Sequence, residues 1–118
     1  FFGDYWKGKA KEAVDHFING RLSKYPQAIV CANDYMAISV CRELGERGIR
    51  VPEEIAVVGF DDTPLCQMVS PSLTTVRQDG ALRARIAIEK LRELKEGRQT
   101  ETQIRLPVQL VVRRSSRT

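Results

Sequence analysis

Residues 55–60, IAVVGF, constrain the fold more than any other stretch, because none of their side chains is polar. A strand that is apolar at every position is buried on both faces, which is typical of the inner strands of a parallel sheet. This strand runs directly into two adjacent carboxylates, Asp61 and Asp62. Neighbouring acids repel each other, so their place at a strand end indicates that another group meets them.

The segments on either side alternate between helix and strand. Apolar residues at helical spacing predict helices at 7–19 and 80–96, and a third helix that Asn33 and Asp34 cap. We expect Gly45 and Gly48 to end the third helix. Short apolar runs predict strands, and a stretch with two prolines predicts a loop. The predicted strands are 28–32, 55–60 and 73–76, the extended segments are 103–106 and 108–112, and the loop is 61–72. The alternation predicts an α/β fold with an open parallel sheet and helices on both faces.

The composition excludes several classes of protein. No apolar run approaches the roughly 20 residues that a membrane helix needs, so we expect no membrane partner. The three cysteines have no CxxC spacing, which argues against a disulfide framework or a zinc site and predicts a cytoplasmic protein. The net charge of +4 comes from basic residues interleaved with acids along the helices, so we expect no direct contact of this chain with DNA.

Polar pairs follow two of the predicted strands, Asn33-Asp34 and Asp61-Asp62. In open α/β sheets, ligands bind outside the carboxyl ends of the strands. Asparagine and aspartate side chains form paired hydrogen bonds with vicinal hydroxyls, and an aromatic ring such as that of Tyr5 covers the apolar face of such a ligand. The pattern therefore predicts a site for a sugar or a nucleoside. Asn33 as a helix cap alone and Asp61 as a turn residue alone remain alternatives.

Motifs of catalysis are missing from the sequence. It has no GxSxG and no glycine-rich phosphate loop, and its one histidine, His16, falls on a predicted helix away from the strand ends. We therefore expect no enzyme activity, no catalytic residue, no metal and no cofactor. One alternative of a different class stays open, which is a magnesium-dependent phosphotransfer domain that uses Asp61 and Asp62.

Three blocks of the sequence carry a resemblance to a known family: PQAIVCANDYMAISVCRELGERGIRVPEEIAVVGFDD at 26–62, SPSLTTVRQD at 70–79 and LPVQLVVRRSS at 106–116. In this order they resemble the C-terminal part of the lactose/galactose-repressor (LacI/GalR) family of bacterial transcription regulators. The sensor core of that family is similar to a periplasmic sugar-binding protein, with an effector between two α/β subdomains. A sugar-binding protein of a transport system is the alternative with the same fold.

The resemblance implies roles for individual residues. Asp62 is expected to fix the turn rather than touch the ligand. The loop residues Met68 and Val69 are apolar because a partner chain is expected to cover them. The implied effector contacts are Tyr5, Asn33, Asp61 and Gln78, and the implied homodimer interface comprises Ile38, Met68 and Val69.

The resemblance also implies a division of the chain. Residues 1–78 are expected to form the C-terminal sensor subdomain, 79–106 a crossover helix and strand of the other subdomain, and 107–118 a returning strand with a basic tail. We expect the chain to be the last third of a repressor that contacts operator DNA only through an N-terminal domain. The helix at 80–96 then lacks its usual partner, so it is expected to pack back on this domain or to swap onto a second copy.

Overall fold

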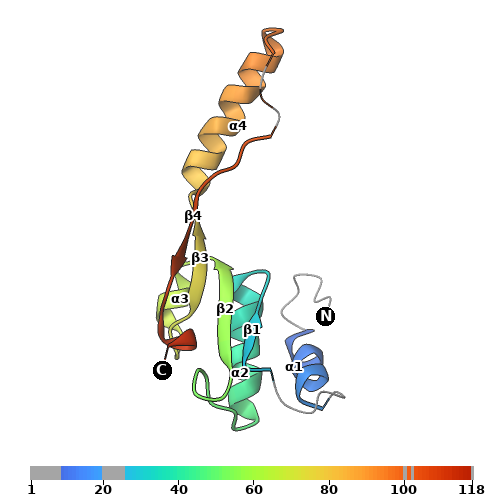
Figure 1. Cartoon of the computed structure of the whole chain (residues 1–118), viewed down its shortest axis with the longest axis vertical. Coiled ribbons are helices and arrows are strands. Elements are labelled where there is room, and N and C mark those ends of the chain that lie inside the picture. The colour runs from blue at the N-terminus through green and yellow to red at the C-terminus, as the bar shows by residue number, and fades with distance from the viewer. Residues whose placement is uncertain (1–8, 20–25, 100, 102, 118) are drawn as a thin grey trace. The chain divides into compact units, whose positions relative to one another are not determined.

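The computed structural model describes residues 9–19, 26–99, 101 and 103–117. Its sheet has the strand order β1-β2-β3-β4, in which β1, β2 and β3 are parallel and β4 runs opposite to β3 (Figure 1). This open α/β sheet confirms the predicted fold class. The elements are α1 (Ala10–Asn19), β1 (Ala28–Val30), α2 (Asp34–Glu46), β2 (Ala56–Asp61), α3 (Leu65–Met68), β3 (Thr74–Gln78), α4 (Gly80–Lys95), β4 (Val108–Val111) and the 3₁₀ helix η2 (Arg114–Ser116).

The described residues divide into two compact units. Unit one contains those up to Arg77 together with those from Leu110 onward, and unit two is Gln78–Gln109. The chain therefore leaves unit one at the end of β3 and returns to it within β4.

The core of unit one lies between α2 and the sheet. Ile29 of β1 pairs with Val57 of β2, and both are buried. Helix α2 places Ala37, Val40 and Leu44 against them, as its apolar spacing predicts. The buried apolar residues are Ala10, Ala13, Val14, Ile29, Cys31, Ala37, Val40, Leu44, Ile55, Val57, Cys66 and Leu73.

Helix α1 packs against α2 through an apolar face and an ion pair. Ala10 and Val14 are buried in the shared core. Arg47 donates to Asp15 across 2.6 Å and to Glu43 across 2.9 Å, so one guanidinium joins the two helices. These contacts fix α1 against α2.

Strand β2 is less uniformly buried than its sequence suggests. Val57 and Gly59 are buried beneath α2, whereas Ala56, Val58 and Phe60 are only half-buried. Successive side chains of a strand point to opposite faces, so the described part of unit one covers one face of β2 more fully than the other.

The last residues of the chain are bonded into the middle of the sheet. The Ser115 hydroxyl donates to the Val57 carbonyl across 2.6 Å and accepts from the Thr74 amide across 2.8 Å. The Arg113 amide donates to the Thr74 hydroxyl, which in turn donates to the Arg113 carbonyl. Ser115 is fully buried, and it therefore joins β2 to β3 as a polar link within the core.

Two local predictions need correction. Residues 61–72 are not entirely a loop, because they contain the helix α3, whose single turn is too short to show an apolar period. Gly45 does not end the preceding helix, since α2 continues to Glu46, and the chain turns at Gly48, whose φ is 74°. The segment at 103–106, predicted to be extended, has no helix or strand, and β4 comes after it.

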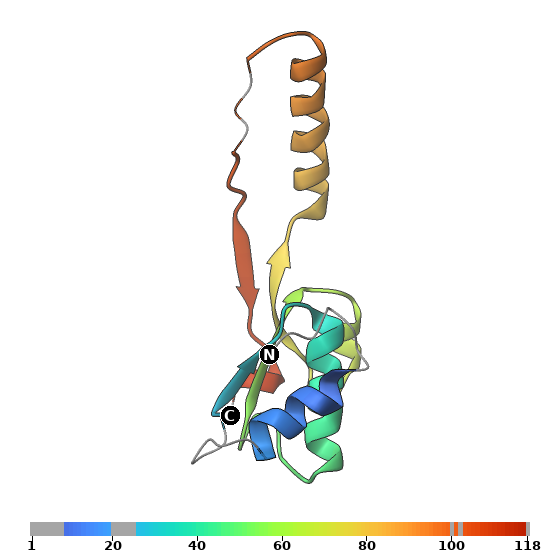
Figure 2. The same cartoon turned by 90° about the vertical axis from the view of Figure 1, so that its right-hand side faces the viewer.

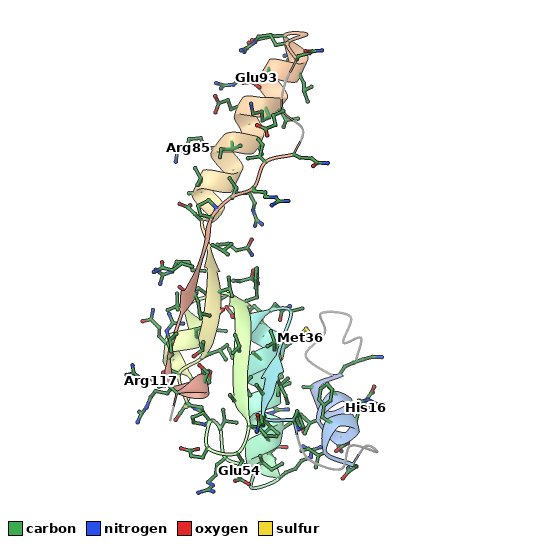
Figure 3. All side chains as sticks on the ribbon, in the orientation of Figure 1. His16, Met36, Glu54, Arg85, Glu93 and Arg117 are labelled. Carbon is green, nitrogen blue, oxygen red and sulfur yellow. The ribbon has the colours of Figure 1, made fainter. Side chains whose placement is uncertain are left out.

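Unit two is helix α4 with an extended segment beside it (Figure 2). Asp79 caps the helix by accepting from the Leu82 amide at 2.8 Å. None of the described α4 residues is buried, and Ile88, Leu91 and Leu94 are 54%, 65% and 55% exposed. Side chains project from both sides of α4 in Figure 3, where Arg85 and Glu93 are labelled. Unit two by itself therefore does not bury the apolar stripe of α4.

Candidate functional site

The acidic turn at the end of β2, Asp61-Asp62, has an unusual backbone. The φ angle is 114° at Asp61 and 56° at Asp62, both in the left-handed region that favours glycine. Aspartate tolerates this region better than most residues, but each such conformation still costs on the order of 1–3 kcal/mol. Asp61 is exposed at this position. Strained backbones of this kind concentrate at functional sites.

The Asp62 carboxylate is held by two arginines from different parts of the chain. Arg77 Nε donates to Oδ2 and Arg113 Nη2 donates to Oδ1, each across 2.6 Å, and the side chain of Asp62 is only 6% exposed. Burial by itself would raise the pKa of this carboxyl, but the hydrogen bonds from Arg113 and Arg77 outweigh it and hold the pKa below its ordinary value. Asp62 therefore acts as an ionised structural anchor.

A second carboxylate, Asp34, lies fully buried beneath the same turn. It accepts from the Thr63 amide at 2.7 Å and from the Thr75 hydroxyl at 2.6 Å, and Thr75 Oγ1 also accepts from the Asp62 amide at 3.3 Å. A Cβ added at Gly59 would lie 2.5 Å from Asp34 Oδ1, so only glycine leaves room for this carboxylate. Asp34 thus ties α2, β3 and the acidic turn together.

Asn33 is the N-cap of α2. Its backbone is extended, and its Oδ1 accepts from the Met36 amide at 2.9 Å (Met36 is labelled in Figure 3). The capping role considered from the sequence is thus present. An asparagine oxygen has a second lone pair and its amide nitrogen has two donors, so capping does not use up the hydrogen-bonding capacity of Asn33. The side chain is half-buried.

Asn33 and Asp61 come together at one edge of the sheet. Asn33 follows β1 and Asp61 ends β2, and these strands are parallel neighbours. The bond from the Thr63 amide to Asp34 joins the turn after Asp61 to the residue that follows Asn33. The structure therefore places these two predicted contacts at the carboxyl ends of adjacent strands.

The other two predicted effector contacts are Gln78 and Tyr5. Gln78 is the last residue of β3 and the first of unit two, and its Oε1 accepts from Arg83 Nη1 at 2.9 Å. Tyr5 lies outside the described residues.

The predicted interface residues are unequal in exposure. Met68 is 79% exposed, whereas Ile38 and Val69 are partly buried and pack against the core of unit one. A methionine so exposed on a short helix is consistent with a surface that another molecule covers.

Sequence reasoning missed the two arginines, and it placed Asp34 at a strand end without predicting its burial. Arg113 lies 51 residues from Asp62, and no local spacing connects them. Gly59 was the available signal, because a glycine inside an otherwise bulky apolar strand indicates that another group approaches the backbone closely.

The arrangement does not favour metal chemistry at Asp61 and Asp62. Two guanidinium groups occupy the oxygens of Asp62, and their positive charges oppose a cation there. Within the described ranges, no group of three or more His, Cys, Asp or Glu residues is arranged to hold a metal ion. His16 lies on α1, with its ring 5.7 Å from that of Phe17. No helix among the described residues is long and apolar enough to cross a membrane.

Comparison with known proteins gives consistent similarities. The family model for a periplasmic binding protein-like domain matches residues 3–116. A lactose operon repressor of Rhizobium radiobacter is 40% identical over 92 residues, which cover 78% of this chain and 81% of that relative. The HTH-type transcriptional repressor PurR of Aliivibrio fischeri (strain MJ11) is 36% identical over 97% of this chain.

The chain covers 34% of that PurR relative and thus spans about a third of its length. Among solved structures, a lac repressor dimer bound to operator and the anti-inducer ONPF matches with a TM-score of 0.86 and 33% identity. The match covers 97% of this chain and 39% of that one.

Proposed function

Because the chain belongs to the LacI/GalR family of transcription regulators and carries its periplasmic binding protein-like domain, we propose that it senses a small-molecule effector and dimerises as part of a repressor. The effector is a sugar or a nucleoside-like molecule with vicinal hydroxyls. Operator DNA is contacted through another domain of the full-length protein.

The proposal rests on one observation, which is that Asp61 is exposed at the end of β2. Its neighbour Asp62 is engaged by two arginines, so the two adjacent acids have different roles. Asp61 is exposed at the sheet edge where Asn33 also lies. A carboxylate forms charge-assisted hydrogen bonds with ligand hydroxyls, each worth about 1.5–3 kcal/mol. Tyr5 and Gln78 are proposed as further contacts.

The proposed mechanism is a population shift. The effector binds between two subdomains and favours one state of closure, and a dimer relays that state to the DNA-binding domains. We assign residues 1–78 to one subdomain, 79–106 to the other and 107–118 to the returning strand. Ile38, Met68 and Val69 form the proposed dimer interface, and the dimeric state of the similar lac repressor supports this assignment.

The test is calorimetric titration of the full-length protein with lactose, glucose, ribose, adenosine and guanosine. We expect one of them to bind, and Asp61→Asn to weaken that binding at least about tenfold, which corresponds to about 1.4 kcal/mol. Asparagine also tolerates the left-handed backbone, so the variant should keep the fold.

Glu53→Gln is the matched control, because Glu53 is also an exposed acid but precedes β2 instead of ending it. The Kd of the Glu53→Gln variant should equal the wild-type Kd for the same compound. Binding that Asp61→Asn leaves unchanged would show that Asp61 is only a turn residue.

A further inference from the structure

We propose that Asp62 is a positioning residue, which holds Asp61 in its left-handed backbone conformation through its bonds to Arg77 and Arg113. This inference rests on the proposed function, in which Asp61 is the carboxylate that meets the effector. Asp62 itself touches no ligand in this scheme.

The conformation of the acidic turn needs an external restraint. Two consecutive aspartates have φ angles of 114° and 56°, and such conformations persist only where the surrounding structure fixes them. Two adjacent carboxylates also repel each other, which favours any conformation that moves them apart. A peptide with this sequence would relax out of the turn if nothing held it.

Contacts of the backbone restrain both ends of the turn, beginning with the pairing of Asp61 with Arg77 between β2 and β3. The Asp62 amide donates to Thr75 Oγ1 at 3.3 Å, which is a long bond, and the Thr63 amide donates to Asp34 at 2.7 Å. These bonds anchor the exit of the turn. The peptide unit between Asp61 and Asp62 lies between this anchored exit and the end of β2.

The Asp62 side chain adds two strong contacts at the turn itself. Its two oxygens accept bonds of 2.6 Å from Arg77 on β3 and from Arg113 beyond β4, so the carboxylate is fixed from two directions. Arg113 is itself fixed, because its Nη1 donates to the Leu73 carbonyl at 2.8 Å and its side chain is only 12% exposed. Charge-assisted bonds of this length are the strongest available to a side chain.

The two arginines also offset the charge of the turn. Their positive charges offset the repulsion between the two aspartates, so the exposed Asp61 side chain can face a ligand beside Asp62. The ending LVVRRSS is thereby part of the binding machinery, because it delivers Arg113 to a turn 51 residues earlier in the sequence.

Hydrogen exchange read by mass spectrometry tests the restraint directly on the full-length protein. We compare wild type with Asp62→Asn, which keeps the shape of the side chain and removes its charge. Peptides covering residues 60–64 should exchange at least about tenfold faster in the variant, whereas peptides covering the core residues 40–46 should exchange at the wild-type rate. Equal exchange at 60–64, or a uniform acceleration in all peptides, would overturn the inference.

Two further variants guard against a simple loss of folding. Arg77→Gln removes one bond from the more exposed side, where Arg77 is 49% exposed, and should accelerate exchange at 60–64 to a smaller extent. Glu54→Gln breaks an exposed ion pair of 3.0 Å with Arg50 and should leave residues 60–64 unchanged. If Asp62→Asn does not fold, the comparison between Arg77→Gln and Glu54→Gln decides the question.

The binding measurement separates the positioning role from the proposed function. For any of the five compounds that binds, the Kd should rise about tenfold in Asp62→Asn and remain unchanged in Glu54→Gln. An unchanged Kd with accelerated exchange would refute the positioning role while leaving Asp61 as a ligand contact. If none of the five binds the wild type, the choice of effector class fails, and the exchange result still decides whether Asp62 holds the turn.

Discussion

Gly59→Ala should be among the most damaging substitutions in unit one. Gly59 lies in β2 directly beneath the buried carboxylate of Asp34. A Cβ there would lie 2.5 Å from Asp34 Oδ1, 3.0 Å from Leu73 Cδ2 and 3.2 Å from Asp34 Cα. The last of these contacts is with the backbone of α2, so moving one flexible side chain cannot relieve the strain.

The expected cost follows from these contacts. Overpacking a well-packed core costs about 1–3 kcal/mol. Displacing Asp34 also weakens its bond from the Thr75 hydroxyl, and a hydrogen bond to a charged group is worth about 1.5–3 kcal/mol. Alanine recovers roughly 0.5–1 kcal/mol because it restricts the unfolded chain more than glycine does. We therefore expect the free energy of unfolding to fall by about 2–5 kcal/mol, a large share of the roughly 5–15 kcal/mol that stabilises an ordinary domain.

Urea denaturation followed by circular dichroism measures this change. Gly80→Ala is the matched control, because a Cβ at Gly80 meets nothing within 4 Å, and alanine is the better helix former at the start of α4. The double variant Gly59→Ala with Asp34→Ala tests the mechanism. Removing the carboxylate relieves the 2.5 Å contact, so the double variant should lose at least about 1 kcal/mol less than the sum of the single variants. Strict additivity, or a single-variant cost below about 1 kcal/mol, would refute the steric argument.

The remaining predictions concern the chain end, pH and thiol reactivity. Ser115→Ala should lower the free energy of unfolding by about 2–4 kcal/mol in urea titrations, because it leaves buried backbone groups of Val57 and Thr74 unpaired; a loss under about 0.5 kcal/mol would contradict the link. The pKa of Asp62 is lower in the folded protein than its ordinary 3.8, so its stabilising contribution is complete above that value and is lost as the pH falls through the folded pKa. The gap in unfolding free energy between wild type and Asp62→Asn should therefore be constant above about pH 5 and shrink below about pH 4 in urea titrations, and a gap that grows on acidification would contradict the assignment. Burial, followed by the hydrogen bond to a neighbouring carboxylate, raises the pKa of the Cys66 thiol to about 11. Mass spectrometry should thus show that iodoacetamide alkylates Cys66 slowly in the native protein and rapidly in urea, both at neutral pH. Equal rates would show that the thiol is accessible in the native protein.

Local patterns in the sequence were sufficient for most of the fold. The apolar spacing of α2 and its cap at Asn33 are encoded within a few residues, and so is the strand that ends at Asp61. The single turn of α3 lacks a period and was missed for that reason.

The candidate site was predicted less completely, because its bonds join distant parts of the chain. The place of Asp61 at a strand end follows from the strand itself. The Asp62 carboxylate is paired with Arg113, which lies 51 residues later in the sequence. The buried Asp34 is bonded to Thr63 and Thr75, which lie 29 and 41 residues after it. Such pairs can be recognised only after the topology of the sheet is known.

The bond between Ser115 and Val57 also sets the order in which the protein can fold. The two residues are 58 positions apart, and all of unit two is synthesised between them. The Val57 carbonyl of β2 and the Thr74 amide of β3 therefore lack their bonds to Ser115 until all of unit two has been synthesised. Contacts of such long sequence separation slow folding, since the entropy of loop closure is lost before the contact forms. During translation, unit one should therefore persist as an incomplete sheet and acquire its final stability only after unit two has been synthesised.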